Sequence, residues 1–168
     1  MSINPAPGTE ITSLLASLDA QRQHVLGILE GLTPEALRRP MLPSGWTCLG
    51  LVRHLALDVE RFWFRGVVAG EQIDLDGDDH AVWQVEPDEP IEKVFALYRQ
   101  EVELANAVIA ATFPDAAPAS WPEDLFPHFR YNVRETVLHV ITETACHAGH
   151  LDAARELIDG RAWLVLTD

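Results

Sequence analysis

Basic residues are scarce in this chain, and their scarcity limits the partners that it can bind. Only 12 of the 168 residues are Lys or Arg, against 26 Asp or Glu, which gives a formal charge of −14. No basic stripe is present that could neutralise successive phosphates, so nucleic acid is excluded as an expected partner. The same acidity disfavours docking on an anionic membrane surface. A small molecule is therefore the expected partner.

Cysteine is also rare, and long apolar runs are missing. Cys48 and Cys146 are the only two cysteines, and they form neither a CxxC pair nor a secreted disulfide framework. The start MSINPAPGTE lacks the basic segment and apolar run of a signal peptide. No stretch approaches the roughly 20 apolar residues of a membrane span. We therefore expect a cytoplasmic protein that works in a reducing compartment.

No segment shows the alternating pattern of a strand, because apolar residues recur at three- and four-residue intervals. At 168 residues and 48% hydrophobic content, the chain is long enough for one domain with a buried core. We predict a single all-α domain over residues 1–168, folded as a four-helix bundle. The long helices are expected between the following residues: Thr9 and Leu32, Thr47 and Gly70, Asp88 and Pro114, and Asn132 and Gly160. Long connections leave the order of the helices open.

Three N-terminal signals support these boundaries. Thr33 precedes a first-turn proline and is expected to cap a short helix that Pro40 ends. Thr47 is the expected cap of the second long helix. Asn132 and Glu135 have the spacing of a capping box at the start of the last helix. Each signal predicts where a helix begins.

The segment 71–89 contains eight acidic residues and no Lys or Arg. This composition predicts a solvated loop that joins two helices without packing on them. Its DLDGDDH stretch invites comparison with an EF-hand, which needs glycine at position six and glutamate at position twelve. Counted from Asp74, Gly77 is fourth and Val85 is twelfth. No calcium site is expected there.

The stretch TETACHAGHLD places several metal-binding or proton-transferring groups on an otherwise apolar helix. Glu143 and His147 are four residues apart and His150 follows three later, so all three project from one side of the helix. His54 lies on the apolar stripe of the second long helix. These positions allow a His2Glu metal set of His54, Glu143 and His147, with one coordination position open. An intrahelical Glu–His ion pair and a hydrogen-bonded core histidine explain the same spacing without a metal.

Two longer segments carry a resemblance to a known family. SGWTCLGLVRHLALDVERFWF around His54 and ITETACHAGHLDAARELIDG around His147 resemble the signature segments of the DinB-like superfamily. The similarity is to its actinobacterial branch, which is related to mycothiol-dependent maleylpyruvate isomerases. It implies a DinB-like four-helix bundle with a divalent ion, zinc or nickel, held by His54, Glu143 and His147. It also implies a homodimer.

The resemblance further implies an enzyme that activates the thiol of mycothiol for attack on a small electrophile, as a transferase or an isomerase-like enzyme. His150 is then the expected proton-transfer group. Isomerisation of maleylpyruvate is not expected, because those isomerases carry a further C-terminal domain and this chain ends at Asp168. Two alternatives remain open: a metal-dependent hydrolase, and a non-catalytic metal-binding or ligand-sensing bundle.

The remaining polar and aromatic residues have simpler interpretations. Asp58 is one turn from His54, which leaves two interpretations: it orients that imidazole, or, as we expect, it is a solvated acid. Cys146 is expected to be a small packing residue, because it points about 100° away from His147 around the helix. Trp46, Phe62 and Trp63 are expected in the core or at a pocket mouth. The four histidines for which the sequence suggests no partners are His24, His80, His128 and His139.

Overall fold

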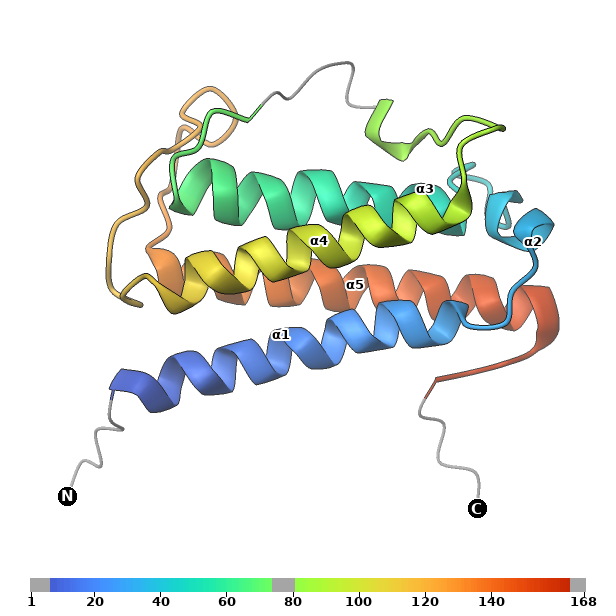
Figure 1. Ribbon diagram of the computed structural model, residues 1–168, viewed down its shortest axis with the longest axis horizontal. Coiled ribbons are helices and arrows are strands. Elements are labelled where there is room, and N and C mark those ends of the chain that lie inside the picture. The colour runs from blue at the N-terminus through green and yellow to red at the C-terminus, as the bar shows by residue number, and fades with distance from the viewer. Residues whose placement is uncertain (1–6, 74–80, 164–168) are drawn as a thin grey trace.

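The computed structural model describes residues 7–73 and 81–163 of the chain. Its long helices lie side by side in a bundle (Figure 1), and no strand occurs in the described ranges. The predicted all-α bundle is therefore confirmed. The elements in chain order are α1 (Pro7–Leu29), α2 (Pro34–Arg38), α3 (Cys48–His54), η1 (Leu55–Val68), η2 (Ala81–Trp83), α4 (Ile91–Ala110) and α5 (Val133–Asp159).

The predicted helix starts are confirmed by hydrogen bonds at each cap. The Thr33 hydroxyl accepts from the Ala36 amide at 3.2 Å, and the Thr47 hydroxyl accepts from the Gly50 amide at 3.0 Å. At α5 the complete capping box forms between Asn132 and Glu135, with bonds of 2.8 and 2.9 Å. These side chains satisfy amide groups that a helix N-terminus otherwise leaves without partners.

The second rod is one continuous helix, but its winding changes along its length. α3 is a regular α-helix that ends at His54, and η1 continues it as a π-helix of 14 residues. The Ala69 amide bonds to the carbonyl of Phe64, five residues earlier, at 2.9 Å. The expectation of one regular helix from Thr47 to Gly70 is thus wrong over 55–68. π-Helical turns occur frequently at functional sites, and His54 lies at this junction.

The direction of the helices settles the order that the sequence left open. α1 and α5 run one way, and the α3–η1 rod and α4 run the other way (Figure 1). η1 packs closely on α4, and α1 packs closely on α5. Since η1 and α4 are parallel neighbours, the connection between them must return along the whole bundle. The connection from α4 to α5 joins antiparallel helices and stays at one end.

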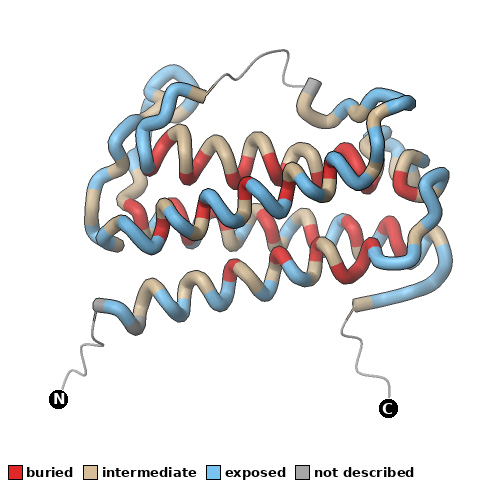
Figure 2. The backbone as a smooth tube through the Cα atoms, viewed as in Figure 1, coloured by how far each residue is buried: buried red, intermediate tan, exposed pale blue. Residues whose placement is uncertain are grey.

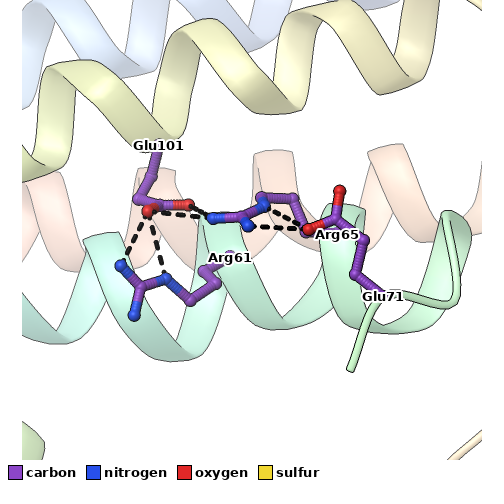
Figure 3. A network of polar contacts seen from close by, with 4 residues as sticks. All are labelled: Arg61, Arg65, Glu71 and Glu101. Carbon is purple, nitrogen blue, oxygen red and sulfur yellow. Dashed lines mark hydrogen bonds and ion pairs between the residues drawn. The ribbon is translucent and has the colours of Figure 1, made fainter. Parts of the chain in front are cut away.

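The bundle core is apolar, and it also holds two carboxylates with their arginines. Buried residues line the inward faces of the helices (Figure 2). Glu60 is fully buried and receives two hydrogen bonds from Arg22, at 2.7 and 2.6 Å. Glu101 receives hydrogen bonds from Arg61 and Arg65, the closest at 2.7 Å (Figure 3). Sequence analysis did not identify these pairs, which link α1, η1 and α4.

The acidic connection packs on the bundle at both of its described ends, so the prediction that it only joins helices is wrong there. Ile73 covers Gly66, where an added Cβ would lie 2.5 Å from the Ile73 side chain. At the other end, the Trp83 carbonyl of η2 lies against Gly50. The DLDGDDH segment itself falls in residues 74–80, outside the described residues.

The chain beyond α5 turns back along α1. Trp163 stacks on His24 with ring centroids 5.0 Å apart, and its ring covers Gly27. Arg155 donates to the carbonyls of Ile28 and Glu30 at 2.7 and 2.9 Å and so caps the end of α1. None of the helices in the described ranges is both long and apolar enough to cross a membrane.

Candidate functional site

The last residue of α3 and the middle of α5 bring two predicted ligands together. The rings of His54 and His147 meet edge to face, with centroids 5.0 Å apart and an interplanar angle of 75°. Their side chains are 14% and 13% exposed, so both are shielded without being sealed from solvent. Two imidazoles that are 93 positions apart in the chain (147 − 54) therefore share one small volume.

His54 is held on two sides. Its Nδ1 lies 2.9 Å from Asp58 Oδ2, one turn further along the rod. The Trp83 ring stacks on the imidazole with centroids 3.9 Å apart and planes 15° from parallel. The expectation that Asp58 is merely solvated is therefore wrong. A carboxylate on Nδ1 fixes the ring and leaves Nε2 as the nitrogen able to bind a metal.

His147 is neutral in this environment. Burial, together with the nearby His54 and His150, lowers the pKa of His147 to about 4. Its Nε2 lies 3.8 Å from Glu143 Oε2, and its Nδ1 lies 3.5 Å from His150 Nδ1. His150 itself is exposed at the edge of the cluster. A neutral imidazole offers a lone pair, which is the form that binds metals.

The donor types in this cluster fit a divalent metal, but the side chains do not yet form a complete coordination shell. Within 7–73 and 81–163, no three His, Cys, Asp or Glu side chains stand at the spacing that a bound ion requires. Imidazole and carboxylate are suitable ligands for zinc or nickel. The Glu143 side chain is 41% exposed and therefore has room to turn toward the two histidines. The donor types therefore suit the predicted set.

The charge balance of the cluster also favours a cation. Asp58 and Glu143 are both partly exposed carboxylates, and their ionic neighbours are the histidines. Among the described residues, neither carboxylate has an ion pair with an Arg or Lys. Glu60 and Glu101, by contrast, are each paired with arginine. In the part of the chain that the structure describes, the negative charge of Asp58 and Glu143 therefore has no Arg or Lys beside it.

A cavity of about 830 Å³ lies on the other side of two tryptophans that contact the histidines. Its walls are the segments before α3 and after η2, with Arg38 of α2. Trp46 lines it and lies near His150, with ring centroids 6.2 Å apart. Trp83 lines it as well and also stacks on His54. The cavity has the size of a typical small-molecule site, and one shared side chain connects it to the candidate ligands.

The far half of α5 carries a separate aromatic cluster, in which His139 has partners that sequence analysis missed. Its ring meets Trp63 at 4.6 Å and Tyr131 at 5.5 Å. Burial lowers the pKa of His139, and Glu143 opposes that shift. Trp63 is buried in the core, as expected. His139 is thus a packing residue one turn from Glu143.

His24 also has partners that the sequence did not suggest. Its Nε2 lies 2.8 Å from Asp152 Oδ1, and its ring stacks on Trp163. This pair lies between α1 and α5, outside the candidate site. Of the remaining two histidines, His128 is exposed, and His80 falls outside the described residues.

The two cysteines have opposite environments. Cys48 is 1% exposed, and burial raises the pKa of its thiol to about 11. Cys146 is exposed next to His147, so the expectation that it packs inside the bundle is wrong. A residue that points about 100° from His147 around the helix does leave the cluster, but here it turns toward solvent.

Trp83 is a residue of the candidate site that sequence analysis missed. It lies in a segment whose charge predicted a loop without packing contacts. A tryptophan within such an acidic stretch was the available signal, because a large aromatic side chain usually finds a surface on which to be buried. Gly50 was the second signal, since a helical glycine allows a close approach by another backbone.

The chain matches a known protein family. The model of a family described as Mycothiol-S-transferase matches residues 13–160. The match includes all four candidate site residues and both segments that line the cavity. It agrees with the predicted DinB-like relationship. Searches of curated proteins and of solved structures gave no match.

Proposed function

Because this chain belongs to the mycothiol-S-transferase family, we propose that it joins the thiol of mycothiol to a small electrophile. In this proposal His54, Glu143 and His147 hold a divalent ion, with zinc preferred and nickel as the alternative. The observation that carries the proposal is the pairing of His54 with His147 close to a cavity. Two carboxylates lie near this pair, and neither has an Arg or Lys partner among the described residues.

The protein's own residues prepare the site for such an ion. Asp58 orients His54 through Nδ1, and His150 lies against Nδ1 of His147, so each ligand has a neighbour that can fix its tautomer. Trp83 covers one face of His54 and limits the access of water to it. A divalent ion bound there would lower the pKa of a thiol that binds in its open position.

The reaction then needs a group that accepts the thiol proton. His150 is exposed at the edge of the cluster and can pass a proton to solvent. The sulfur forms a bond to the electrophilic carbon, and the displaced electron pair leaves with the leaving group or moves into a conjugated acceptor. The proposed role of His150 is therefore proton transfer, while His54, Glu143 and His147 bind the ion.

The proposal is tested by metal analysis followed by a thiol-consumption assay. The purified protein should contain about one zinc or nickel per chain and should accelerate the conjugation of mycothiol with a generic electrophile such as monochlorobimane. His54→Ala should lose the ion, because the two ligands remaining on α5 hold it poorly. His150→Ala should keep the ion and react more slowly.

Two results would contradict the proposal. Unchanged metal content in His54→Ala would exclude the ligand set, and loss of metal from His150→Ala would make His150 a ligand. Metal-loaded protein that neither binds mycothiol nor consumes it would exclude thiol transfer and would favour a metal-binding bundle without this activity.

A further inference from the structure

Burial along the α3–η1 rod repeats every four residues. From residue 51 to residue 68, two buried residues alternate with two partly exposed ones. On a regular α-helix, with 3.6 residues per turn, this pattern would drift around the axis, whereas the wider winding of η1 keeps it in line. His54, Asp58 and Phe62 therefore form one partly exposed column along the rod.

This column runs beside a matching column on α5. His54 meets His147 with ring centroids 5.0 Å apart, and further along the rod Trp63 meets His139 at 4.6 Å. The rod and α5 run in opposite directions (Figure 1). Each step of four residues along the rod therefore matches a step of four residues back along α5.

The levels of this seam change from polar to aromatic. The level next to the two imidazoles holds Asp58 and Glu143, which are both partly exposed carboxylates. The level after it holds Phe62 and His139, which are also partly exposed. The Trp63 ring is buried and contacts both of them, at 5.1 Å from Phe62 and 4.6 Å from His139. Its indole is thus the floor of an aromatic surface between these two side chains.

This aromatic surface continues into the connection before α5. Tyr131 lies 5.5 Å from His139, and Phe129 lies 5.0 Å from Tyr131 and is 44% exposed. Burial lowers the pKa of His139, so its imidazole is neutral at pH 7. Arg130 is ion-paired with the Glu123 carboxylate. A ligand on this surface meets ring faces and a neutral imidazole, which suit an uncharged planar group.

We propose that the electrophile is an uncharged, planar ring compound, and that Phe62 binds its ring while the reacting carbon lies toward His54 and His147. This inference rests on the proposed function and deepens it, because it names the substrate class and a residue that selects it. Eight residues of helix separate Phe62 from His54, roughly 10–12 Å. A two-ring compound with a reactive side group spans this distance. The cavity lies beyond the start of α3, on the other side of His54.

The test compares two electrophiles that react at the same kind of carbon. Monochlorobimane carries its CH₂Cl group on a planar bicycle, and chloroacetamide carries one without a ring. With either compound the sulfur of mycothiol displaces chloride, which leaves with the bonding electrons, and the thiol proton passes to solvent. Phe62→Ala should lower kcat/KM for monochlorobimane roughly fivefold to tenfold. It should leave kcat/KM for chloroacetamide and the KM for mycothiol unchanged.

Two further variants make this result specific. Phe62→Leu keeps an apolar side chain and should fold as the wild type does, with a smaller selective loss of about threefold. Phe95→Ala is the matched control, because Phe95 is partly buried like Phe62 but lies on α4, with Arg99 over its ring at 5.8 Å. It should change neither rate. Equal loss with both electrophiles in the Phe62 variants would overturn the inference, and so would an unchanged rate with monochlorobimane.

Binding without reaction separates this inference from the proposed function. The compound syn-(methyl,methyl)bimane has the same bicycle and no chlorine, and titration calorimetry gives its Kd for the purified protein. Phe62→Ala should weaken its binding roughly fivefold to tenfold. Binding that depends on Phe62, without turnover of mycothiol, would contradict the transferase and leave the aromatic site standing. Turnover of mycothiol with bimane binding that does not depend on Phe62 would overturn the aromatic site and leave the transferase standing.

Discussion

The α3–η1 rod carries acidic side chains on two sides, and the two sides differ in burial and in the partners of these carboxylates. Toward α1, Glu60 is fully buried and accepts hydrogen bonds from Nε and Nη2 of Arg22, whose Nη1 donates to Asp19 and Asn106. Burial raises the pKa of Glu60, and the hydrogen bonds from Arg22 oppose that rise. Near α5, Asp58 is partly exposed and faces only a histidine.

This difference separates a structural role from a chemical one. A buried carboxylate must be paired, because an isolated charge in the core is strongly unfavourable. The arginines around Glu60 and Glu101 meet that need, so these two carboxylates already have cationic partners. The cluster of His54, Asp58, Glu143 and His147 lacks such a cation among the described residues. The divalent ion proposed above would supply that positive charge.

The largest expected effect comes from breaking the buried ion pair. Arg22→Met leaves Glu60 without a partner in the core, and the free energy of unfolding should fall by about 3–5 kcal/mol. Urea unfolding followed by circular dichroism measures this change. The double variant Arg22→Met/Glu60→Met should recover most of the loss, because no unpaired charge remains. Metal content in the double variant should match that of the wild type. A loss of metal would show that the Arg22–Glu60 pair also supports the histidine cluster, which contradicts the separation of the two roles.

The next effect sharpens the role of Asp58 as the residue that orients His54. Asp58→Ala should weaken the affinity for zinc by roughly 10–100-fold, as measured by competition with a chromophoric chelator. Asp152→Ala is the matched control, because it breaks a similar Asp–His contact at His24 outside the site. It should leave the affinity unchanged. Equal zinc affinity in Asp58→Ala and wild type would show that His54 needs no orienting carboxylate.

A smaller effect is expected from filling the space at Gly50. An added Cβ there would lie 2.2 Å from the Trp83 carbonyl, so Gly50→Ala must displace η2 and unstack Trp83 from His54. The KM for mycothiol should rise several-fold. Gly149→Ala is the matched control, because no atom lies within 4 Å of its added Cβ. It should keep the wild-type KM and stabilise α5 by about 0.5–1 kcal/mol. A normal KM in Gly50→Ala would show that the position of Trp83 is not important.

The smallest effect concerns the two cysteine thiols, of which one is buried and the other is exposed. In the native protein, one thiol per chain should react quickly with a disulfide reagent, because Cys146 is exposed and Cys48 is buried with a pKa of about 11. Both should react in denaturant. Cys146→Ala should retain transferase activity, since Cys146 has no proposed role in the reaction. Loss of activity in this variant would make Cys146 part of the site.

Sequence analysis anticipated the bundle and its helix starts because those features depend on local chemistry. The caps at Thr33, Thr47 and Asn132 need only neighbours three residues away. The grouping of Glu143, His147 and His150 on one side of α5 follows from helical spacing alone. The signal for Glu60 and Glu101 was also present, since both lie at helical spacing from buried apolar residues. Their arginine partners could not be assigned, because those contacts join different helices.

Helical spacing and capping chemistry by themselves determined the helices, the apolar faces and the candidate ligands of this protein. Tertiary structure alone decided the direction of each helix, the π-helical winding of η1 and the stacking of Trp83 on His54. It also decided which acids are paired with arginine. The physical reason is distance along the chain: local hydrogen bonds and periodicity act over a few residues. Contacts between remote segments depend on how whole helices pack, and one glycine at position 50 admits the backbone that completes the site.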